Sequence, residues 1–450
     1  MKKVLIANRG EIALRIIQAC HDLGLQTVAV YSRADAKSSH LLHADEAVCI
    51  GDKQAQDSYL KIPHILSACE ITGADAIHPG YGFLSENADF ASICAQCSIE
   101  FIGPSHSVIS LLGNKVEAKE SAKQVGCPVI PGSPGVVESV SKAVSCAEKI
   151  GYPVLIKAVS GGGGRGIQIV SDSEELERKF PQAQSEAKSN FGNEQLYLEK
   201  FIEGPRHIEI QIMADRWGQV IHLGERDCTI QRNQQKLLEE SPSPVLTPEL
   251  REKMGAVSVQ LAKHTGYVSA GTIEFLVDRE QNFYFMEANT RIQVEHTVTE
   301  EVTGLDLVQL QLLIAMGESL PLTQGELSPR GHALQFRINA EDSFRGFAPR
   351  PGKLEHFFPP GGPHVRVDTA CYSGYEVPPH YDSMIAKLIV RGRDREEAVR
   401  RGRRALREFY IKGIPTTIPF HQKLLSDRQF LSGQYDLHFV SQFLAKESTE

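Results

Sequence analysis

The hydrophobic pattern at the start of the chain alternates between short apolar runs and one segment of helical period. Residues 4–7 and 27–31 are apolar runs typical of strands. Between them, residues 11–23 repeat apolar positions at the spacing of an amphipathic helix that ends at Gly24. A strand, a helix and a second strand in this order predict a parallel sheet with helices over roughly the first hundred residues. The turn-rich residues 78–87 lie where a later strand should end, which is the edge at which such sheets bind ligands. No GxGxxG motif follows the first strand, so a dinucleotide site is not indicated.

Proline and glycine divide the middle of the chain. Residues 131–135 read Pro-Gly-Ser-Pro-Gly, and we expect a small β-rich unit from there to about residue 204. The Ser-Pro repeat at residues 241–244 is a second break. Thr247 and Pro248 then predict the N-cap and the first residue of a helix.

Two strand-like runs follow, at residues 271–277 and 283–289, and the polar turn between them predicts a hairpin. The prolines and glycines of residues 349–363 open a last region, which should be β-rich and then helical from about residue 395. The whole pattern predicts a mixed α/β protein in which helices and strands both contribute to several units.

The second strand of the predicted hairpin continues into a row of polar residues. Alternation places Glu287, Asn289 and Arg291 on one face, and Gln293 and Glu295 as well if the strand persists. Unpaired buried charge is costly, so carboxylates, an amide and a guanidinium side by side suit a hydrated divalent cation, an anionic substrate and a base. A solvated strand face is the alternative.

The partner strand of the hairpin adds a second carboxylate, Glu274. Two carboxylates on paired strands, with Asn289 adjacent, offer the hard oxygen ligands that Mg²⁺ prefers when it bridges to nucleotide phosphates.

A glycine-rich segment is the other strong motif. Gly161 to Gly164 lie between two β-like runs, and such a hairpin tip lets backbone amides approach phosphate oxygens. It is not a Walker A loop, and its apolar, β-branched flanks disfavour a flexible linker. Lys157 on the preceding strand could neutralise a phosphate. Glu199 could accept a hydrogen bond from an adenine amino group, although a Glu-Lys pair such as Glu199-Lys200 is also common on surfaces.

Composition describes an ordinary globular protein. The chain has 450 residues, 23% charged and 41% hydrophobic, which is long enough for about three domains. The net charge of −8 argues against a general nucleic-acid binder, and the basic stretch at residues 391–407 is interspersed with glutamates, as on the polar face of a helix. No run approaches a membrane span, and the first residues do not resemble a signal peptide. Nine cysteines are typical of reduced thiols, so we expect a cytoplasmic protein.

Taken together, the glycine hairpin, the Glu-Lys connector and the paired carboxylates resemble the ATP-grasp ligases, and further motifs narrow the resemblance to the biotin carboxylases. It extends over essentially the whole chain. These motifs are Asn8-Arg9-Gly10-Glu11-Ile12-Ala13, His78-Pro79-Gly80-Tyr81-Gly82, the glycines from Gly161 to Gly166, Arg291-Ile292-Gln293-Val294-Glu295-His296 and Tyr381-Asp382-Ser383-Met384.

The resemblance implies an ATP-grasp fold in three domains. These would be a Rossmann-like N-terminal domain (residues 1–113), an ATP-grasp domain (114–330) with a β-rich lid at about 131–204, and a C-terminal mixed domain (331–450). The sequence has no Ala-Met-Lys-Met biotinylation motif. We therefore expect a free-standing subunit that works with a separate biotin carboxyl carrier protein and carboxyltransferase subunits, and that forms a homodimer.

The resemblance also implies roles for individual residues. Those implied to bind ATP are Lys115, Lys157, Gly163, Gly164, Glu199, Lys200, Phe201, Ile202, His207, Gln234, Glu274 and Glu287. Two Mg²⁺ or Mn²⁺ ions would be held by Glu274, Glu287 and Asn289. Bicarbonate would contact Lys236, Arg291, Gln293, Val294 and Glu295, and biotin would contact Tyr81, Gly82 and Arg337. The residues implied to be catalytic are Arg291, Glu295, Arg337 and Lys236.

Two positions depart from the family pattern. Gln234 replaces a histidine that touches the nucleotide, although an amide can still bond a ribose hydroxyl. Gln335 stands where a glutamate is usual, which removes a charge near Arg337.

The implied reaction is the first half-reaction of acetyl-CoA carboxylase in fatty acid synthesis. Glu295 would take the bicarbonate proton, the anion would attack the γ-phosphoryl group of ATP, and the resulting carboxyphosphate would release CO₂ to biotin. The alternatives are a subunit serving pyruvate or another acyl-CoA, a different ATP-grasp ligase, and a nucleotide-sensing or scaffold protein with a dead site.

Overall fold

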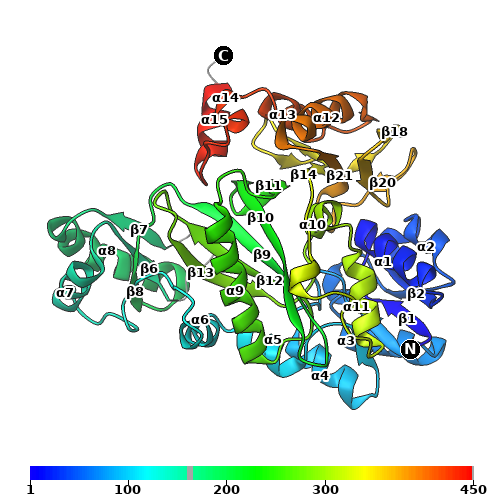
Figure 1. Ribbon diagram of the computed structural model, residues 1–450, viewed down its shortest axis with the longest axis horizontal. Coiled ribbons are helices and arrows are strands. Elements are labelled where there is room, and N and C mark those ends of the chain that lie inside the picture. Colours follow the sequence, from blue (N-terminus) through cyan, green and yellow to red (C-terminus); the bar gives the residue numbers. More distant parts are fainter. Residues whose placement is uncertain (160–165, 448–450) are drawn as a thin grey trace.

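The computed structural model describes residues 1–159 and 166–447. Figure 1 shows a parallel sheet at the N-terminal end, a long antiparallel sheet through the middle, and a small unit at the opposite side. The predicted mixed α/β class is confirmed.

The N-terminal sheet has five parallel strands in the order β3-β2-β1-β4-β5. The predicted strand–helix–strand start is confirmed by β1 (Lys3–Ile6), α1 (Gly10–Asp22) and β2 (Gln26–Ser32). The strand order reverses between β1 and β4 (Ala76–His78), and in such sheets ligands bind outside the carboxyl ends at the reversal. The remaining elements are η1 (Arg33–Asp35), α2 (His40–His43), β3 (Glu46–Gly51), η2 (Ala55–Asp57), α3 (Ile62–Thr72), α4 (Ala88–Gln96), β5 (Glu100–Phe101) and α5 (His106–Gly113).

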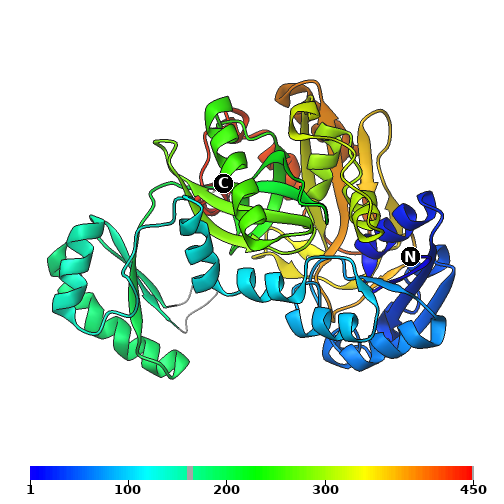
Figure 2. The ribbon, with the colours of Figure 1, turned by 60° about the horizontal axis from the view of Figure 1, so that its bottom comes forward.

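The unit between residues 131 and 204 contains the antiparallel sheet β7-β6-β8 and, beyond the strands that the sequence predicted, two helices. The longer helix buries a stripe of Leu176, Phe180, Ala183 and Ala187 at helical spacing, a period hidden within a polar sequence. The predicted glycine tip lies outside the described residues. Figure 2 shows this unit standing apart from the rest of the molecule. Its elements, with the preceding helix, are α6 (Lys115–Gln124), α7 (Val140–Ile150), β6 (Val154–Ala158), β7 (Ile167–Val170), α8 (Ser173–Phe191) and β8 (Leu196–Lys200).

An eight-stranded sheet, in the order β13-β12-β9-β10-β11-β14-β21-β19, joins the middle of the chain to its C-terminal region. All of its strand pairs are antiparallel. The predicted hairpin is confirmed, and Glu274 lies directly opposite Glu287 in it. The strands are β9 (Arg206–Ala214), β10 (Val220–Arg232), β11 (Gln235–Ser241), β12 (Ser269–Val277), β13 (Phe283–Asn289), β14 (His332–Asn339), β19 (Val365–Asp368) and β21 (Met384–Gly392).

Helices cover this sheet, and two of them begin where the sequence predicts. In α9 (Pro248–Thr265), Thr247 caps the helix by accepting a hydrogen bond from the Leu250 amide at 3.2 Å. The basic stretch lies on α12 (Arg395–Glu408), where arginines pair with glutamates one turn away, as expected of a polar helix face. The other elements are α10 (His296–Thr303), α11 (Leu307–Ala315), η3 (Gln324–Glu326), β15 (Glu341–Asp342), β16 (Ala348–Pro349), β17 (Gly352–Lys353), β18 (His356–Phe358), β20 (Glu376–Val377), β22 (Tyr410–Lys412), α13 (Ile418–Leu424), α14 (Arg428–Leu431) and α15 (Phe439–Glu447).

None of the helices in the described part of the chain combines the length and the apolar composition needed to cross a membrane. All nine cysteines lie in that part and are free thiols.

Two buried histidines make stability depend on pH. Burial lowers the pKa of His40 and of His421 to about 4. An unfolded chain has histidine pKa values of about 6.5, so it binds more protons than the folded chain between these values. Each histidine therefore makes its full contribution to the free energy of unfolding above pH 6.5. That contribution, about 3 kcal/mol for each histidine, is lost as the pH drops toward 4. We expect His421→Asn to lose less of its urea midpoint between pH 7.5 and pH 5 than the wild type. The exposed His356→Asn is the control, and identical pH dependence in all three proteins would contradict this assignment.

Candidate active site

A cavity of about 440 Å³ lies at the carboxyl ends of β1 and β4, where the N-terminal sheet reverses its strand order. Asn8 ties the two loops together, since its side-chain amide donates to the carbonyls of Pro79 at 2.7 Å and Tyr81 at 2.8 Å. The cavity is lined by residues from the beginning, middle and end of the chain. Among the predicted site residues, it brings together Tyr81, Gly82, Lys236, Arg291, Val294 and Arg337.

Lys236 is surrounded by three buried carboxylates. Its ammonium nitrogen lies 2.7 Å from Glu209, 3.1 Å from Glu274 and 2.5 Å from Glu295. Burial alone would lower the pKa of Lys236, but the acidic groups of Cys228 and these three glutamates hold it well above its usual value. Lys236 is therefore a permanent cation beside the cavity.

Glu295 lies between two cations. One carboxylate oxygen meets Lys236, and the other accepts from Nη2 of Arg337 at 3.0 Å. Burial would raise the pKa of Glu295, but the charges of Lys236, Arg337 and Arg226 outweigh it and hold the pKa below its usual range. Arg337 is itself oriented by Glu239, which accepts from Nε at 2.6 Å. The guanidinium thus contacts Glu239 through Nε and Glu295 through Nη2, and these two contacts fix its orientation.

The predicted metal ligands share one corner of the site. Glu274 accepts hydrogen bonds from Asn289 at 2.9 Å and Gln293 at 2.8 Å, and it lies 2.8 Å from His207. Burial and the neighbouring Glu274 raise the pKa of Glu287. None of the described side chains forms a hydrogen bond or ion pair with Glu287. Two adjacent carboxylates, one without a cation of its own, fit a divalent ion with oxygen ligands.

The row of polar residues is not one continuous strand. The strand does not persist beyond Asn289, so the condition under which Gln293 and Glu295 would share its face is not met. β13 ends at Asn289, because Glu86 accepts from the Thr290 amide at 3.1 Å and from Arg291 Nε at 2.9 Å and draws the chain away. Gln293, Val294 and Glu295 lie in the loop before α10. Long-range contacts then return them to the site: the Gln293 side-chain oxygen accepts from the buried Arg226 at 3.0 Å.

The residues predicted for the nucleotide lie beside this centre and at the base of the projecting unit. Glu199 pairs with Lys119 at 2.5 Å and with Lys157, and these lysines outweigh burial to lower the pKa of Glu199. Lys200 donates to the carbonyls of residues 151 and 152, both at 2.9 Å. Phe201 and Ile202 directly follow β8.

Other nucleotide candidates are scattered. Lys115 is the first residue of α6 and is exposed, although its charge acts on Glu287. Gln234 lies at the exposed tip of the β10–β11 turn, and His207 contacts Glu274. Gly163 and Gly164 lie outside the described residues.

Several side chains that build the site were not predicted. Glu209, Arg226, Glu239, Lys119 and Lys387 are all of this kind. The signal for Glu209 was present, because residues 206–214 alternate polar and isoleucine positions, as in a strand with one polar face. Arg226, Glu239 and Lys387 occur in strands without such a pattern.

Lys387 connects the cavity wall to the loop of the site. It is fully buried, lies 3.0 Å from Glu11 and 3.6 Å from Asp368, and donates to the carbonyl of Val294 at 3.3 Å. Glu11 in turn accepts a hydrogen bond from the Tyr81 hydroxyl. One buried ammonium therefore orients residues on both sides of the cavity.

We expect Lys387→Met to destabilise the protein by about 3–5 kcal/mol, because it leaves Glu11 buried without its cation. Asp368 would keep Arg366, which bonds it at 2.7 Å, so Glu11 accounts for most of the loss. Thermal unfolding measures the loss. Lys387→Arg keeps the charge and should recover part of it, whereas unchanged melting of Lys387→Met would show that the ion pairs are dispensable.

Comparisons with known proteins agree over the whole chain. Residues 1–109 match the family "Biotin carboxylase, N-terminal domain", residues 114–323 match "Carbamoyl-phosphate synthase L chain, ATP binding domain", and residues 335–442 match "Biotin carboxylase C-terminal domain". The chain is 55% identical to biotin carboxylase 1 of Bacillus subtilis over 444 residues, which is 98% of this chain and 99% of the relative.

Two further relatives bear on the partner reaction and the ligands. A pyruvate carboxylase subunit of Methanothermobacter thermautotrophicus is 51% identical over 441 residues, 98% of this chain and 90% of that protein. The biotin carboxylase domain dimer of Hydrogenobacter thermophilus 2-oxoglutarate carboxylase, solved with MgADP, ADP and bicarbonate, is 50% identical with a TM-score of 0.90. That match covers 98% of this chain and 97% of the other.

Proposed function

This chain belongs to the biotin carboxylase family of ATP-grasp ligases and catalyses ATP-dependent carboxylation of biotin, and we propose that it is the free-standing subunit of an acetyl-CoA carboxylase. The supporting observation for the chemistry is the contact chain from Lys236 through Glu295 to Arg337 at the wall of one cavity. It holds two cations and a carboxylate where two anionic reactants have to meet.

The domain division proposed here has an N-terminal domain at residues 1–113, an ATP-grasp domain at 114–330 and a C-terminal domain at 331–450. The ranges of the family matches support it, as does the separate N-terminal sheet. The unit at 131–204 would act as a lid, because carboxyphosphate is short-lived in water and closure would exclude solvent.

In the first step Glu295 accepts the proton of bicarbonate. The freed oxygen attacks the γ-phosphorus of ATP, the bond to the β-phosphate oxygen breaks, and ADP and carboxyphosphate form. Such a transfer depends mainly on positioning and on neutralising charge, which Lys236 and Arg291 supply beside the attacking anion. Gln293 and the Val294 amide would complete the bicarbonate site.

Without ligands, neighbouring cations hold the pKa of Glu295 below its usual range, so its use as a base needs an explanation. Lys236 and Arg337 both lie on Glu295. Bicarbonate is an anion that would contact Lys236 beside Glu295, so its binding would leave Glu295 with less compensating charge. The pKa of Glu295 then rises toward the value that proton transfer needs.

In the second step carboxyphosphate separates into CO₂ and phosphate, and the phosphate takes the ureido proton of biotin. Arg337 would stabilise the resulting enolate-like oxygen, since a guanidinium remains charged and donates two hydrogen bonds. The biotin nitrogen then forms its bond to CO₂. Tyr81 and Gly82 would line the approach of biotin.

Glu274, Glu287 and Asn289 would hold two Mg²⁺ or Mn²⁺ ions, which neutralise the phosphates of ATP. Lys115, Lys157, Glu199, Lys200, Phe201, Ile202, His207 and Gln234 would bind the nucleotide, with the glycines of the lid over its phosphates. In the described state Glu199 is engaged by two lysines, so nucleotide phosphates would have to draw Lys157 away from it.

The remaining proposals concern partners. Biotin would arrive on a separate carrier protein, the carboxyl group would pass to carboxyltransferase subunits, and the chain would act as a cytoplasmic homodimer. The dimeric relative and the nine free thiols support the last two points. The alternative is a subunit of a pyruvate carboxylase, which the relative from Methanothermobacter favours.

Biotin-dependent ATP hydrolysis with and without bicarbonate tests the reaction, and absence of bicarbonate dependence would contradict it.

We expect Arg337→Ala to lower biotin carboxylation by about 10²–10³-fold, because a preorganised donor to the developing charge is lost. Bicarbonate-dependent ATP cleavage without biotin should fall much less. Both rates are measured on one preparation, with the exposed Arg345→Ala as control. Equal losses of the two rates would refute the separate role of Arg337.

Glu287→Gln should raise the Mg²⁺ concentration for half-maximal ATP cleavage about 10-fold or more, because a neutral amide replaces an anionic ligand. Titration of Mg²⁺ at saturating ATP measures this. Glu280→Gln, in the exposed turn of the same hairpin, should behave as the wild type. A Glu287→Gln curve that overlays the wild type would exclude Glu287 as a ligand.

A further inference from the structure

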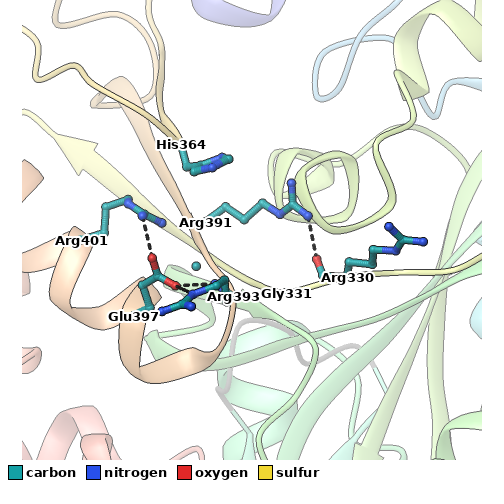
Figure 3. A pocket seen from close by; sticks show the side chains of 8 residues that line it. Arg330, Gly331, His364, Arg391, Arg393, Glu397 and Arg401 are labelled. Atoms are coloured by element: carbon teal, nitrogen blue, oxygen red, sulfur yellow. Dashed lines mark hydrogen bonds and ion pairs between the residues drawn. The ribbon is translucent and has the colours of Figure 1, made fainter.

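We propose that a second, basic pocket in the C-terminal region binds a phosphate group, either free or on a small metabolite. This pocket has a volume of about 420 Å³ and lies at one end of the long sheet. Its lining, drawn in Figure 3, is Arg330, Gly331, His364, Arg391, Gly392, Arg393, Glu397 and Arg401.

The strand register brings these residues together from separate parts of the sequence. His332 at the start of β14 pairs with Gly392 at the end of β21, and Val365 at the start of β19 pairs with Val390. Arg330, His364 and Arg391 therefore lie at the same end of three adjacent strands. The first turns of α12 close the pocket with Glu397 and Arg401.

The pocket has a large excess of positive charge. Four arginines and one carboxylate line it. Glu397 is shared, since it accepts from Arg393 at 2.9 Å and from Arg401 Nη2 at 2.9 Å. Among the described residues, the Arg391 side chain donates only to the backbone carbonyl of Arg330, at 3.2 Å. Arg393 and Arg401 thus share one carboxylate, and Arg391, whose charge acts on Glu301, forms no ion pair within that part of the chain.

Two donor groups of the pocket have no partner among the described residues. Nη1 of Arg401 is buried and makes no hydrogen bond there, although an unsatisfied buried donor costs free energy. Arg330 is exposed to solvent, and its guanidinium has no hydrogen bond or ion pair within the described ranges. In Figure 3, Arg401 lies across the open space from His364 and the stem of Arg391, and the Arg391 guanidinium points toward the Arg330 carbonyl. His364 is held there in a left-handed backbone conformation, with φ of 57°.

A phosphate suits this pocket better than a carboxylate. A phosphate monoester carries roughly −1.5 to −2 charges at pH 7 and three strong acceptor oxygens, and guanidinium groups bind it in a fork geometry. The volume falls in the range of small-molecule sites, about 300–1,000 Å³, so it has room for an organic body as well.

The pocket is separate from the active site. Arg337 lies five residues along β14 from His332, which at about 3.4 Å per residue is a distance of about 17 Å. The two pockets have no lining residue in common.

Isothermal titration with inorganic phosphate and with glycerol 3-phosphate tests the proposal, with the nucleotide site saturated by ADP. We expect the double variant Arg391→Ala/Arg401→Ala to bind both probes at least about 10-fold more weakly than the wild type, since two charge-assisted contacts are lost. The matched control is Arg400→Ala on the same helix, which pairs with Glu396 outside the pocket. Tighter binding of glycerol 3-phosphate would assign the site to a phosphorylated metabolite, and tighter binding of phosphate to the free ion.

Equal affinity in the wild type and the double variant, or no binding by the wild type at millimolar concentration, would overturn the proposal. The double variant should retain biotin-dependent ATP cleavage within about twofold, which verifies that it folds. Should it not fold, wild-type crystals soaked in phosphate decide the question. Density between Arg391 and Arg401 supports the site, and density confined to the active site refutes it.

Discussion

The contact of Lys236 with Glu209, Glu274 and Glu295 is the interaction on which the rest of the site depends. Those carboxylates come from β9, β12 and the loop before α10, and each is almost completely buried. Buried anions without a cation cost several kcal/mol each, so Lys236 on β11 is what allows the four segments to bring their acids together. Arg226 also forms an ion pair with Glu209, and its guanidinium donates a hydrogen bond to Gln293. Because the network is connected, the positions of the proposed base, the proposed metal ligand Glu274 and the proposed bicarbonate ligand Gln293 depend on one another.

The eight-stranded sheet extends this network from β11 to β14, where Gln335 and Arg337 lie. β11 pairs with β14, and in that register Glu239 lies opposite Gln335. Gln335 donates to Glu239 at 2.9 Å, and Glu239 holds Arg337. The glutamine at position 335, where the family usually has a glutamate, thus has a structural explanation. Its amide donates to the neighbouring carboxylate of Glu239, which a second glutamate would repel. Lys236 on β11 and Arg337 on β14, which are proposed to act on bicarbonate and on biotin, therefore lie on neighbouring strands of one sheet.

Local sequence patterns predicted those parts of the structure that are formed by residues close together in the sequence. The hairpin of Glu274 and Glu287 followed from alternation and a polar turn, and the start of α9 followed from Thr247 and Pro248. The parts of the site that the sequence left open or did not indicate depend on distant contacts. Gln293 and Glu295 leave the strand because Glu86, about two hundred residues away in sequence, holds the chain at Thr290 and Arg291. Lys387 has its partner Glu11 near the opposite end of the chain. The helices α7 and α8 were not predicted, because charged residues hide their short apolar stripes.

The direct opposition of Glu274 and Glu287 has a consequence for the evolution of the protein. Like charges facing each other across a strand pair destabilise a hairpin, and burial together with that repulsion raises the pKa of Glu287. Almost any neutral residue at position 287 would therefore make the empty protein more robust. Selection or engineering for heat resistance alone would favour the loss of this carboxylate, and with it the proposed cation site. The hairpin is a place where durability and activity are opposed, and its acids persist only under selection for function.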